Sequence, residues 1–322
     1  MDYEPMGSVE AMRRMARADL MLLVTVGLWG FNVTVTKYVL THGFRPLAYS
    51  AVRYGGAALL FSALTYRMEG TLSVRRRDLA LLLVAAGVGV WLNQITYMYA
   101  VKLTTATTVA LIFGSTPIFA ALIARGFGLE RLSRIFWLAT VVSFVGVSLV
   151  AVGSGGGLSG DVGGDLLAVA SAATWAAYSV IVAPLMRSYS PYQISAFVLA
   201  VGWVPLAATG ARQLAAQDWG ALNWVDWVGF GYALLGPLVL TNILWFTAID
   251  RVGPSRATLF GNMQPFVAAL FALAILSERI TPLQIVGGVA IGAAILLCRV
   301  RRPRRAAPEA EERAAATKVA AR

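Results

Sequence analysis

A 32-residue segment occurs twice in this chain, and this duplication constrains the fold more than any other feature. The first copy begins at residue 100 and the second at residue 248, so they align at a constant separation of 148 residues. A proline inside an apolar run and a Glu-Arg pair at its end both recur, which indicates an internal repeat rather than a chance match. The identical positions in the first copy are Ala100, Leu111, Pro117, Ala120, Ala121, Leu122, Ala124, Glu130 and Arg131.

The composition decides which solvent surrounds this repeat. Hydrophobic residues make up 58% of the 322 residues, charged residues make up only 13%, and the mean hydropathy is +0.69. Each copy contains an apolar run of roughly 20 residues, which is long enough to cross the hydrocarbon core of a bilayer. Soluble globular domains are far more polar. We therefore expect an integral membrane protein with the lipid bilayer as its surroundings.

The inventory of reactive residues is small. Cys298 is the single cysteine and His42 the single histidine, so we expect neither an internal disulfide nor a histidine metal cage. We expect no enzyme and no cofactor on that inventory. The formal net charge is +11, but the basic residues lie between apolar segments, which indicates membrane topology and no nucleic-acid partner.

Hydropathy predicts ten spans in two sets of five. The first apolar run is too long for a signal peptide and lacks a small-residue cleavage site, so we expect it to stay as the first helix. We expect a cytoplasmic N-terminal tail at 1–18, a first repeat at 19–153, a Gly-rich linker at 154–164, a second repeat at 165–300, and a cytoplasmic basic tail at 301–322.

An odd number of helices per repeat makes the second copy enter the membrane in the opposite sense. The predicted fold is therefore an all-α integral membrane protein with ten transmembrane helices, arranged as two inverted five-helix repeats. With the N-terminus inside, 21 lysines and arginines lie on the inner side and 5 on the outer side, which favours cytoplasmic termini. Inverted repeats recur in secondary transporters, which points to alternating access.

Several motifs recur in order along the two halves. They are WGFNVTVTK, RYGGAALL, KLTTATTVALIFGSTPIFAALIA and LERL in the first half, and GDLLAVASAATWAAYSVIV and ATLFGNMQPFVAALFALAILSERI in the second. Together they resemble the drug/metabolite transporter superfamily, specifically its ten-helix bacterial permeases with two EamA domains. The resemblance covers residues 19 to 300 and implies a multi-pass transporter of a bacterial plasma or inner membrane. The chain departs from it at Leu129 and Ser277, where glycine is expected before the terminal glutamate, and at Phe31, where a small residue is common.

Two prolines are the candidate gating residues. Pro117 and Pro265 occupy equivalent repeat positions near the centre of a span, and each leaves a carbonyl four residues earlier without its helical donor. They are either bends of gating helices or kinks that only shape the packing.

Polar and aromatic residues inside the spans are the candidate substrate contacts. The repeat pairs Gln94 with Asn242 and Tyr97 with Trp245, and buried amides in a membrane need a partner or a polar cavity. Helix-to-helix hydrogen bonds and simple packing remain the alternative interpretation. The same two interpretations apply to Trp29, Asn32, Trp175 and Tyr178.

Charge inside the spans predicts the substrate class. No carboxylate falls inside the ten predicted spans, whereas Arg53 lies well within the second. An arginine at this depth suits a carboxylate, so we expect an amino acid or a related metabolite. Lys37 is shallower and is expected to reach the interface. Glu130 and Glu278 lie at helix ends, where capping or a surface ion pair is expected.

Other assignments stay open at this point. Polyspecific efflux of cationic drugs is the second candidate, a membrane receptor is a third, and a homodimer is compatible with the sequence. The fifth and tenth predicted helices carry few polar residues, and Gly287, Gly288 and Gly292 would allow close helix approach. We expect these two helices at the periphery of the bundle.

Overall fold

The computed structural model describes residues 6–128, 134–153, 162–252, 260–261 and 263–300. Within these ranges the regular structure is entirely helical, with no strand. By length and apolar composition, six helical segments can cross a membrane, and a bent helix pair makes a seventh. Residues 154–161 of the linker predicted at 154–164, Glu130 and the tail at 301–322 lie outside the described residues. The last three residues of that predicted linker, 162–164, instead belong to the helix that begins at Val162.

Among the described residues, the first half contains seven α-helices. They are α1 (Met6–Thr41), α2 (Pro46–Glu69), α3 (Arg76–Ala86), α4 (Asn93–Leu103), α5 (Ala106–Phe113), α6 (Thr116–Gly126) and α7 (Arg134–Gly153). The helix α1 extends back to Met6, so the expected N-terminal tail is helical from that residue onward. A π-helical segment, η1 (Gly87–Leu92), joins α3 to α4 into one long span.

The described elements of the second half repeat most of this order, with an added 3₁₀ turn. It comprises α9 (Val162–Val182), the 3₁₀ turn η2 (Leu185–Arg187), α10 (Pro191–Ala215), α11 (Trp224–Leu234), the π-helical segment η3 (Leu235–Leu240), α12 (Thr241–Val252), α14 (Gln264–Leu276) and α15 (Pro282–Val300). The two π-helical segments begin 148 residues apart, which is the separation of the repeat. Such segments disturb the 3.6-residue phase of a helix and often lie at functional sites.

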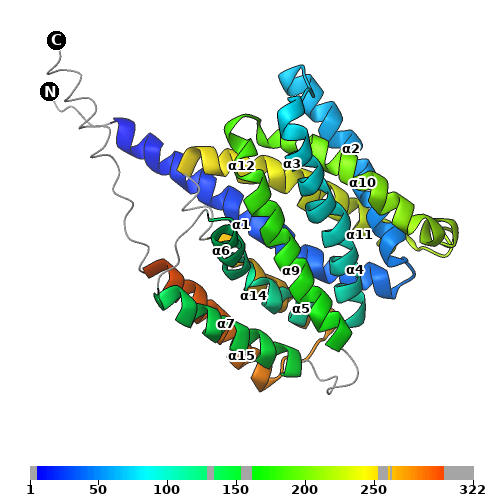
Figure 1. The fold of residues 1–322 in the computed structure, drawn as a ribbon. Coiled ribbons are helices and arrows are strands. Elements are labelled where there is room, and N and C mark those ends of the chain that lie inside the picture. Colours follow the sequence, from blue (N-terminus) through cyan, green and yellow to red (C-terminus); the bar gives the residue numbers. More distant parts are fainter. Residues whose placement is uncertain (1–5, 129–133, 154–161, 253–259, 262, 301–322) are drawn as a thin grey trace, which may run out of the picture.

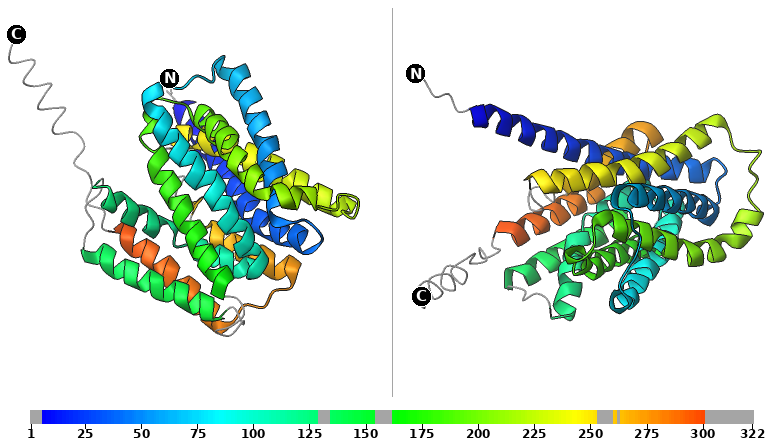
Figure 2. Two further views of the ribbon diagram at one scale, coloured as in Figure 1. Left: turned by 45° about the vertical axis from the view of Figure 1, so that its right-hand side comes forward. Right: turned by 90° about the horizontal axis from the view of Figure 1, so that it is seen from above.

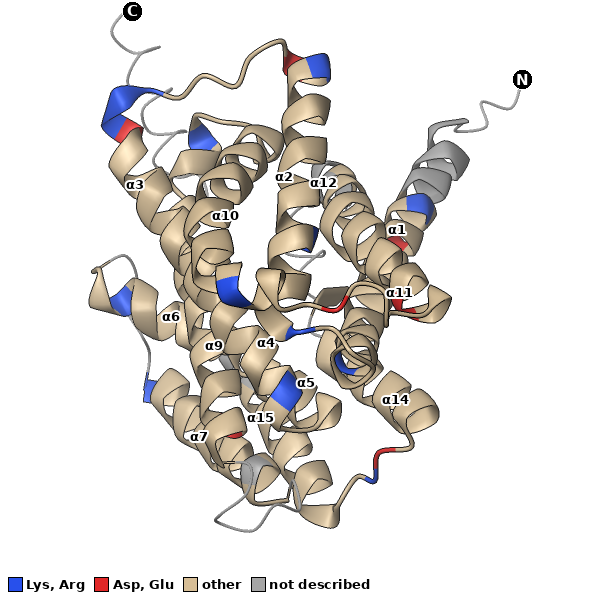
Figure 3. Cartoon of the chain, turned by 90° about the vertical axis from the view of Figure 1, so that its right-hand side faces the viewer, with Lys and Arg blue, Asp and Glu red and all other residues tan. Residues whose placement is uncertain are grey.

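Helices from the two halves alternate in the bundle. The helix α1 packs against α12 and α14, α9 packs against α4 and α6, and α2 packs along α10. The central helices cross one another in a bundle, while α7 and α15 lie together along one side (Figures 1 and 2). Few charged residues lie along the lengths of the helices. Most basic and acidic residues lie at helix ends and in connections (Figure 3).

Glycines set the approach of α7 and α15. A Cβ atom on Gly287 would lie 2.5 Å from the Gly146 carbonyl oxygen, and one on Gly146 would lie 2.7 Å from the Gly287 carbonyl oxygen. Contacts this short leave no room for a side chain, so the backbones touch directly. Of the three glycines expected to allow close helix approach, Gly287 does so at this contact, which the sequence did not assign to a particular partner helix. Gly288 instead faces Leu111 of α5.

Candidate functional site

Arg53 is the central charged residue of the bundle. It lies on α2, two turns from the start of that helix, and only 2% of its surface is exposed. Its guanidinium lies over the rings of Tyr49 and Tyr54, at 5.0 Å and 5.3 Å from their centroids. One terminal nitrogen donates to Gln94 Oε1 at 3.1 Å. Among the described residues, Arg53 forms no ion pair with a carboxylate.

Several polar atoms around Arg53 have no hydrogen-bond partner among the described residues. They include Arg53 Nε, the Tyr49 hydroxyl and the Thr36 hydroxyl of α1, all buried. Thr36 lies near the hydroxyls of Tyr49 and Tyr97, so α1, α2 and α4 converge here. Leaving such groups unpaired in a low-dielectric interior costs about 1–3 kcal/mol each, and more for a charged group. A bound polar solute would relieve that cost.

A chain of amides links this cluster to the second half. Gln94 Oε1 also accepts from the Ser50 hydroxyl at 2.9 Å, and its amide nitrogen lies 3.4 Å from Asn93 Oδ1. The Asn93 amide in turn donates to the Ser171 carbonyl oxygen at 2.9 Å and to the Thr174 hydroxyl at 3.1 Å, both on α9. The position of Gln94 is therefore fixed through contacts with α2 and α9.

An aromatic pair lies further along α1. The rings of Trp29 and Trp245 are 5.1 Å apart, so the structure brings together two predicted contact residues from opposite halves. The Trp29 indole nitrogen donates to the Pro237 carbonyl oxygen of η3 at 3.3 Å, and the Thr241 hydroxyl donates to the same oxygen at 2.6 Å. Because Trp29 precedes Thr36 by seven residues on α1, the pair lies roughly 10 Å along the helix from the arginine cluster.

The remaining predicted contact residues do not join either of these two groups. The rings of Trp175 and Tyr178 on α9 contact each other in a tilted arrangement, with centroids 5.4 Å apart, but Trp175 is 42% exposed. The Asn242 amide donates to the Leu238 carbonyl oxygen of its own helical segment at 2.6 Å. Asn32 Oδ1 is buried without a hydrogen-bond partner among the described residues. The structure therefore gathers Arg53, Gln94 and Tyr97 in one cluster, Trp29 and Trp245 in a second, and Trp175 and Tyr178 in a third.

The two prolines begin helices instead of lying within continuous ones. Pro117 is in the first turn of α6, which is bent by 43° from α5, and Pro265 is in the first turn of α14. The Phe113 carbonyl oxygen, which Pro117 deprives of its donor, accepts from the Thr116 hydroxyl at 2.6 Å. A Cβ atom on Gly114 would lie 3.5 Å from Pro265 Cγ, so the two proline regions are neighbours.

One expectation about charge is wrong. Asp19 and Asp165 lie inside apolar helical spans, because α1 and α9 begin before the points where hydropathy rises. The Lys37 ammonium donates to the carbonyl oxygens of Val101 at 2.8 Å and Thr104 at 2.7 Å, at the end of α4 and of its span. A helix C-terminus presents unpaired carbonyls and a partial negative charge, which bind this cation.

The expected capping role of Glu278 is confirmed, although the helix it caps is α5 and not its own. Its carboxylate accepts from the Ala106 and Thr107 backbone nitrogens, each at 2.9 Å. The preceding residue, Ser277, has a φ of 52°, in the left-handed region that glycine adopts most easily. This conformation explains why a glycine was expected at that position.

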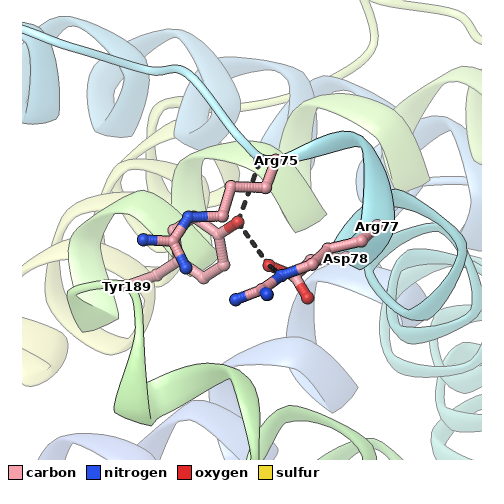
Figure 4. A network of polar contacts seen from close by, with 4 residues as sticks. All are labelled: Arg75, Arg77, Asp78 and Tyr189. Atoms are coloured by element: carbon pink, nitrogen blue, oxygen red, sulfur yellow. Dashed lines mark hydrogen bonds and ion pairs between the residues drawn. The ribbon is translucent and has the colours of Figure 1, made fainter.

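A second polar network joins the connections at one end of the bundle. The Tyr189 hydroxyl donates to Asp78 Oδ2 at 2.8 Å and accepts from the Arg75 backbone nitrogen at 2.9 Å (Figure 4). Arg77 Nε lies 3.7 Å from the same carboxylate oxygen. These contacts fasten the α2–α3 connection to the segment before α10. Because the residues are held by one another, the network is a structural tie between the halves.

The model of the EamA-like transporter family matches residues 16–152 and again residues 162–300. The chain belongs to this family. The uncharacterized transporter YyaM of Bacillus subtilis is 24% identical over 84% of the chain and 90% of the relative. A probable terminal-alkyne amino-acid exporter of Streptantibioticus cattleyicolor is 25% identical over 89% of the chain and 95% of the relative. One solved crystal structure aligns with a TM-score of 0.61 at 17% identity, over 90% of this chain and 99% of its own, and so shares the fold.

The sequence alone missed part of the arginine cluster in this EamA-like transporter. Tyr49, Ser50 and Asn93 were not predicted, although Tyr49 lies four residues before Arg53 and therefore on the same helix face. Asn93 follows the π-helical segment η1, whose altered phase cannot be read from hydropathy.

Proposed function

We propose that this EamA-like transporter is a secondary transporter that moves a small carboxylate-bearing metabolite of the amino-acid type by export or exchange. The observation that carries the proposal is Arg53, a buried guanidinium without a carboxylate partner among the described residues. Ionised residues inside membrane proteins mark substrate and ion pathways. A guanidinium fork with a free Nε matches the two oxygens of a carboxylate. The named function of the S. cattleyicolor relative supports the same class of solute.

Alternating access in this proposal rests on ten spans arranged as two inverted repeats. The helices α3, α4, α6 and α7 begin 148 residues before α11, α12, α14 and α15, respectively. The packing pairs also exchange: α1 packs on α12 and α14, as α9 packs on α4 and α6. A two-fold axis in the membrane plane would produce this exchange, and rocking of one half against the other would expose the site alternately.

The proposed orientation in the cell membrane places both termini in the cytoplasm. The basic residues favour this arrangement, because most of them then lie on the inner side. The repeats are proposed as two structural units, residues 19–153 and 165–300. In this orientation the α4–α5 connection and the end of α14 lie on the outer side. Solute would reach Arg53 from either side, with Tyr49, Tyr97 and Gln94 around its carboxylate.

The aromatic pair gives the proposed solute its second contact. Trp29 and Trp245 lie roughly 10 Å along α1 from Thr36, a distance that an amino acid with a large side chain can bridge. Flat indole rings bind apolar and aromatic groups through area and ring geometry. The arginine would select the charged group, and the tryptophans would select the organic part.

A thermal-shift screen of the purified protein tests the assignment. Amino acids, their amides, nucleosides and cationic dyes would each be added, since a ligand that binds only the folded state raises its apparent stability. We expect stabilisation by a free carboxylate and not by the matching amide. Stabilisation by cationic dyes alone would instead support the drug-efflux alternative.

A further inference from the structure

We propose that Glu278 is a gating residue, whose carboxylate closes one end of the transport path by holding α5 of the first half to the end of α14 in the second. This inference rests on the proposed alternating-access function and adds the contact that must break when that end opens. Glu278 Oε1 accepts from Ala106 N at 2.9 Å, and Oε2 accepts from Thr107 N at 2.9 Å and from the Thr107 hydroxyl at 2.7 Å. One side chain thus makes three contacts across the halves.

The electrostatics of the corner between α4 and α5 favour this closed arrangement. Only Thr104 and Thr105 separate the C-terminus of α4 from the N-terminus of α5. The first helix end carries partial negative charge and binds the Lys37 ammonium, whereas the second carries partial positive charge and binds the Glu278 carboxylate. Lys37 belongs to the first half, as does the corner. Glu278 belongs to the second half, so its bonds join the two halves and must break when the halves separate at this end.

A second contact across the halves lies on the same corner. The Thr104 hydroxyl donates to Asp165 Oδ1 at 2.7 Å, and Asp165 lies in the first turn of α9. A Cβ atom on Gly164 would lie 2.9 Å from the Thr104 backbone nitrogen, so the start of α9 rests directly on the corner. The corner is therefore held from two sides by residues of the second half.

The backbone before Glu278 is arranged for this contact. Ser277 has a φ of 52° and ends α14 in the left-handed conformation. A non-glycine residue is sterically strained in this conformation, and such strained residues are common at switches and functional contacts. The left-handed turn directs the next residue away from the axis of α14. Glu278 can then reach the amides of α5 instead of continuing along its own helix.

The test measures the opening of this end directly and requires no substrate. Spin labels would be placed at Leu103 and Ile275, which are 47% and 50% exposed and lie at the ends of α4 and α14. The native Cys298 is first replaced by serine. The distance between the two labels is measured by pulsed electron paramagnetic resonance in lipid nanodiscs. Three proteins are compared: the labelled protein that retains Glu278, its Glu278→Gln variant and its Asp218→Asn control. Asp218 makes its backbone contacts within its own connection, at Gly220 and Ala221.

We expect Glu278→Gln to increase the ratio of long to short distances by about tenfold, which corresponds to about 1.4 kcal/mol. Asp218→Asn should leave the distribution unchanged. Thr107→Val removes one donor while preserving the shape of the side chain, and should shift the ratio in the same direction by a smaller factor. Unchanged distances in both Glu278→Gln and Thr107→Val, with normal helix content, would overturn the gating role. A failure of the carboxylate assignment alone would leave these distances as expected.

Discussion

Replacing Arg53 by glutamine separates binding from folding. The change removes the guanidinium that donates to Gln94 Oε1 and lies over the Tyr49 and Tyr54 rings. It retains a polar but shorter and uncharged side chain. No ion pair with a described residue is lost, because Arg53 makes none. The loss should therefore fall on the bound solute more than on the protein.

The expected magnitudes follow from burial. Removing one partner of a buried, hydrogen-bonded charge pair costs about 2–4 kcal/mol of binding, which raises Kd by roughly 30-fold to 1,000-fold. Folding loses one charge-assisted hydrogen bond and the ring contacts, each worth about 1–3 kcal/mol. Folding of the variant also no longer requires the desolvation of a buried ion, which costs several kcal/mol. These opposing terms should leave Tm nearly unchanged.

The assay pairs solute binding with thermal unfolding of the same samples. The control is Arg45→Gln, which removes an exposed arginine at the N-cap of the same helix, and it should retain wild-type affinity. Equal weakening in both variants would show that α2 charge in general, and not the Arg53 site, supports binding. Wild-type affinity in Arg53→Gln would refute the carboxylate anchor outright.

Three further changes test the packing and the site. Gly287→Ala should lower Tm, because the added Cβ would lie 2.5 Å from the Gly146 carbonyl oxygen. The control Gly27→Ala adds a Cβ in open space and should not lower Tm. Equal Tm values for the two variants would contradict the close α7–α15 contact. Ser277→Gly should raise unfolding free energy by about 1 kcal/mol, because glycine adopts the left-handed region without strain; a decrease in denaturant midpoint would argue against it. Gln94→Leu should weaken solute binding about tenfold by releasing Arg53, and undiminished affinity would remove Gln94 from the site.

The sequence was informative where polarity or symmetry stands out. Arg53 and Gln94 were candidates because charges and amides are rare within spans, and the structure joins them at 3.1 Å. Trp29 and Trp245 were candidates because of their places in the two repeats, and their ring centroids lie 5.1 Å apart in a tilted arrangement. Neither contact could be paired in advance, because hydropathy gives the span of a helix but not its rotation toward a neighbour.

The exact helix boundaries and the π-helical segments could not be predicted from the sequence. Hydropathy rises after Asp19 and Asp165, but hydrogen-bonded helix continues before both, so these carboxylates lie inside helices. The π-helical segments depend on tertiary packing and leave no periodic signal. The partners of the Lys37 ammonium, the carbonyl oxygens at the end of α4, could not be predicted, because hydropathy does not show which helix end lies beside α1.

The most direct test of the account is counterflow in liposomes that contain the purified protein. Liposomes are loaded with an unlabelled free amino acid, and a trace of the labelled compound is added outside. The account predicts transient accumulation of label with wild-type protein, none when the loaded solute is the matching amide, and strongly reduced accumulation with Arg53→Gln. Accumulation of a labelled quaternary ammonium dye and of no carboxylate would contradict the proposed substrate class.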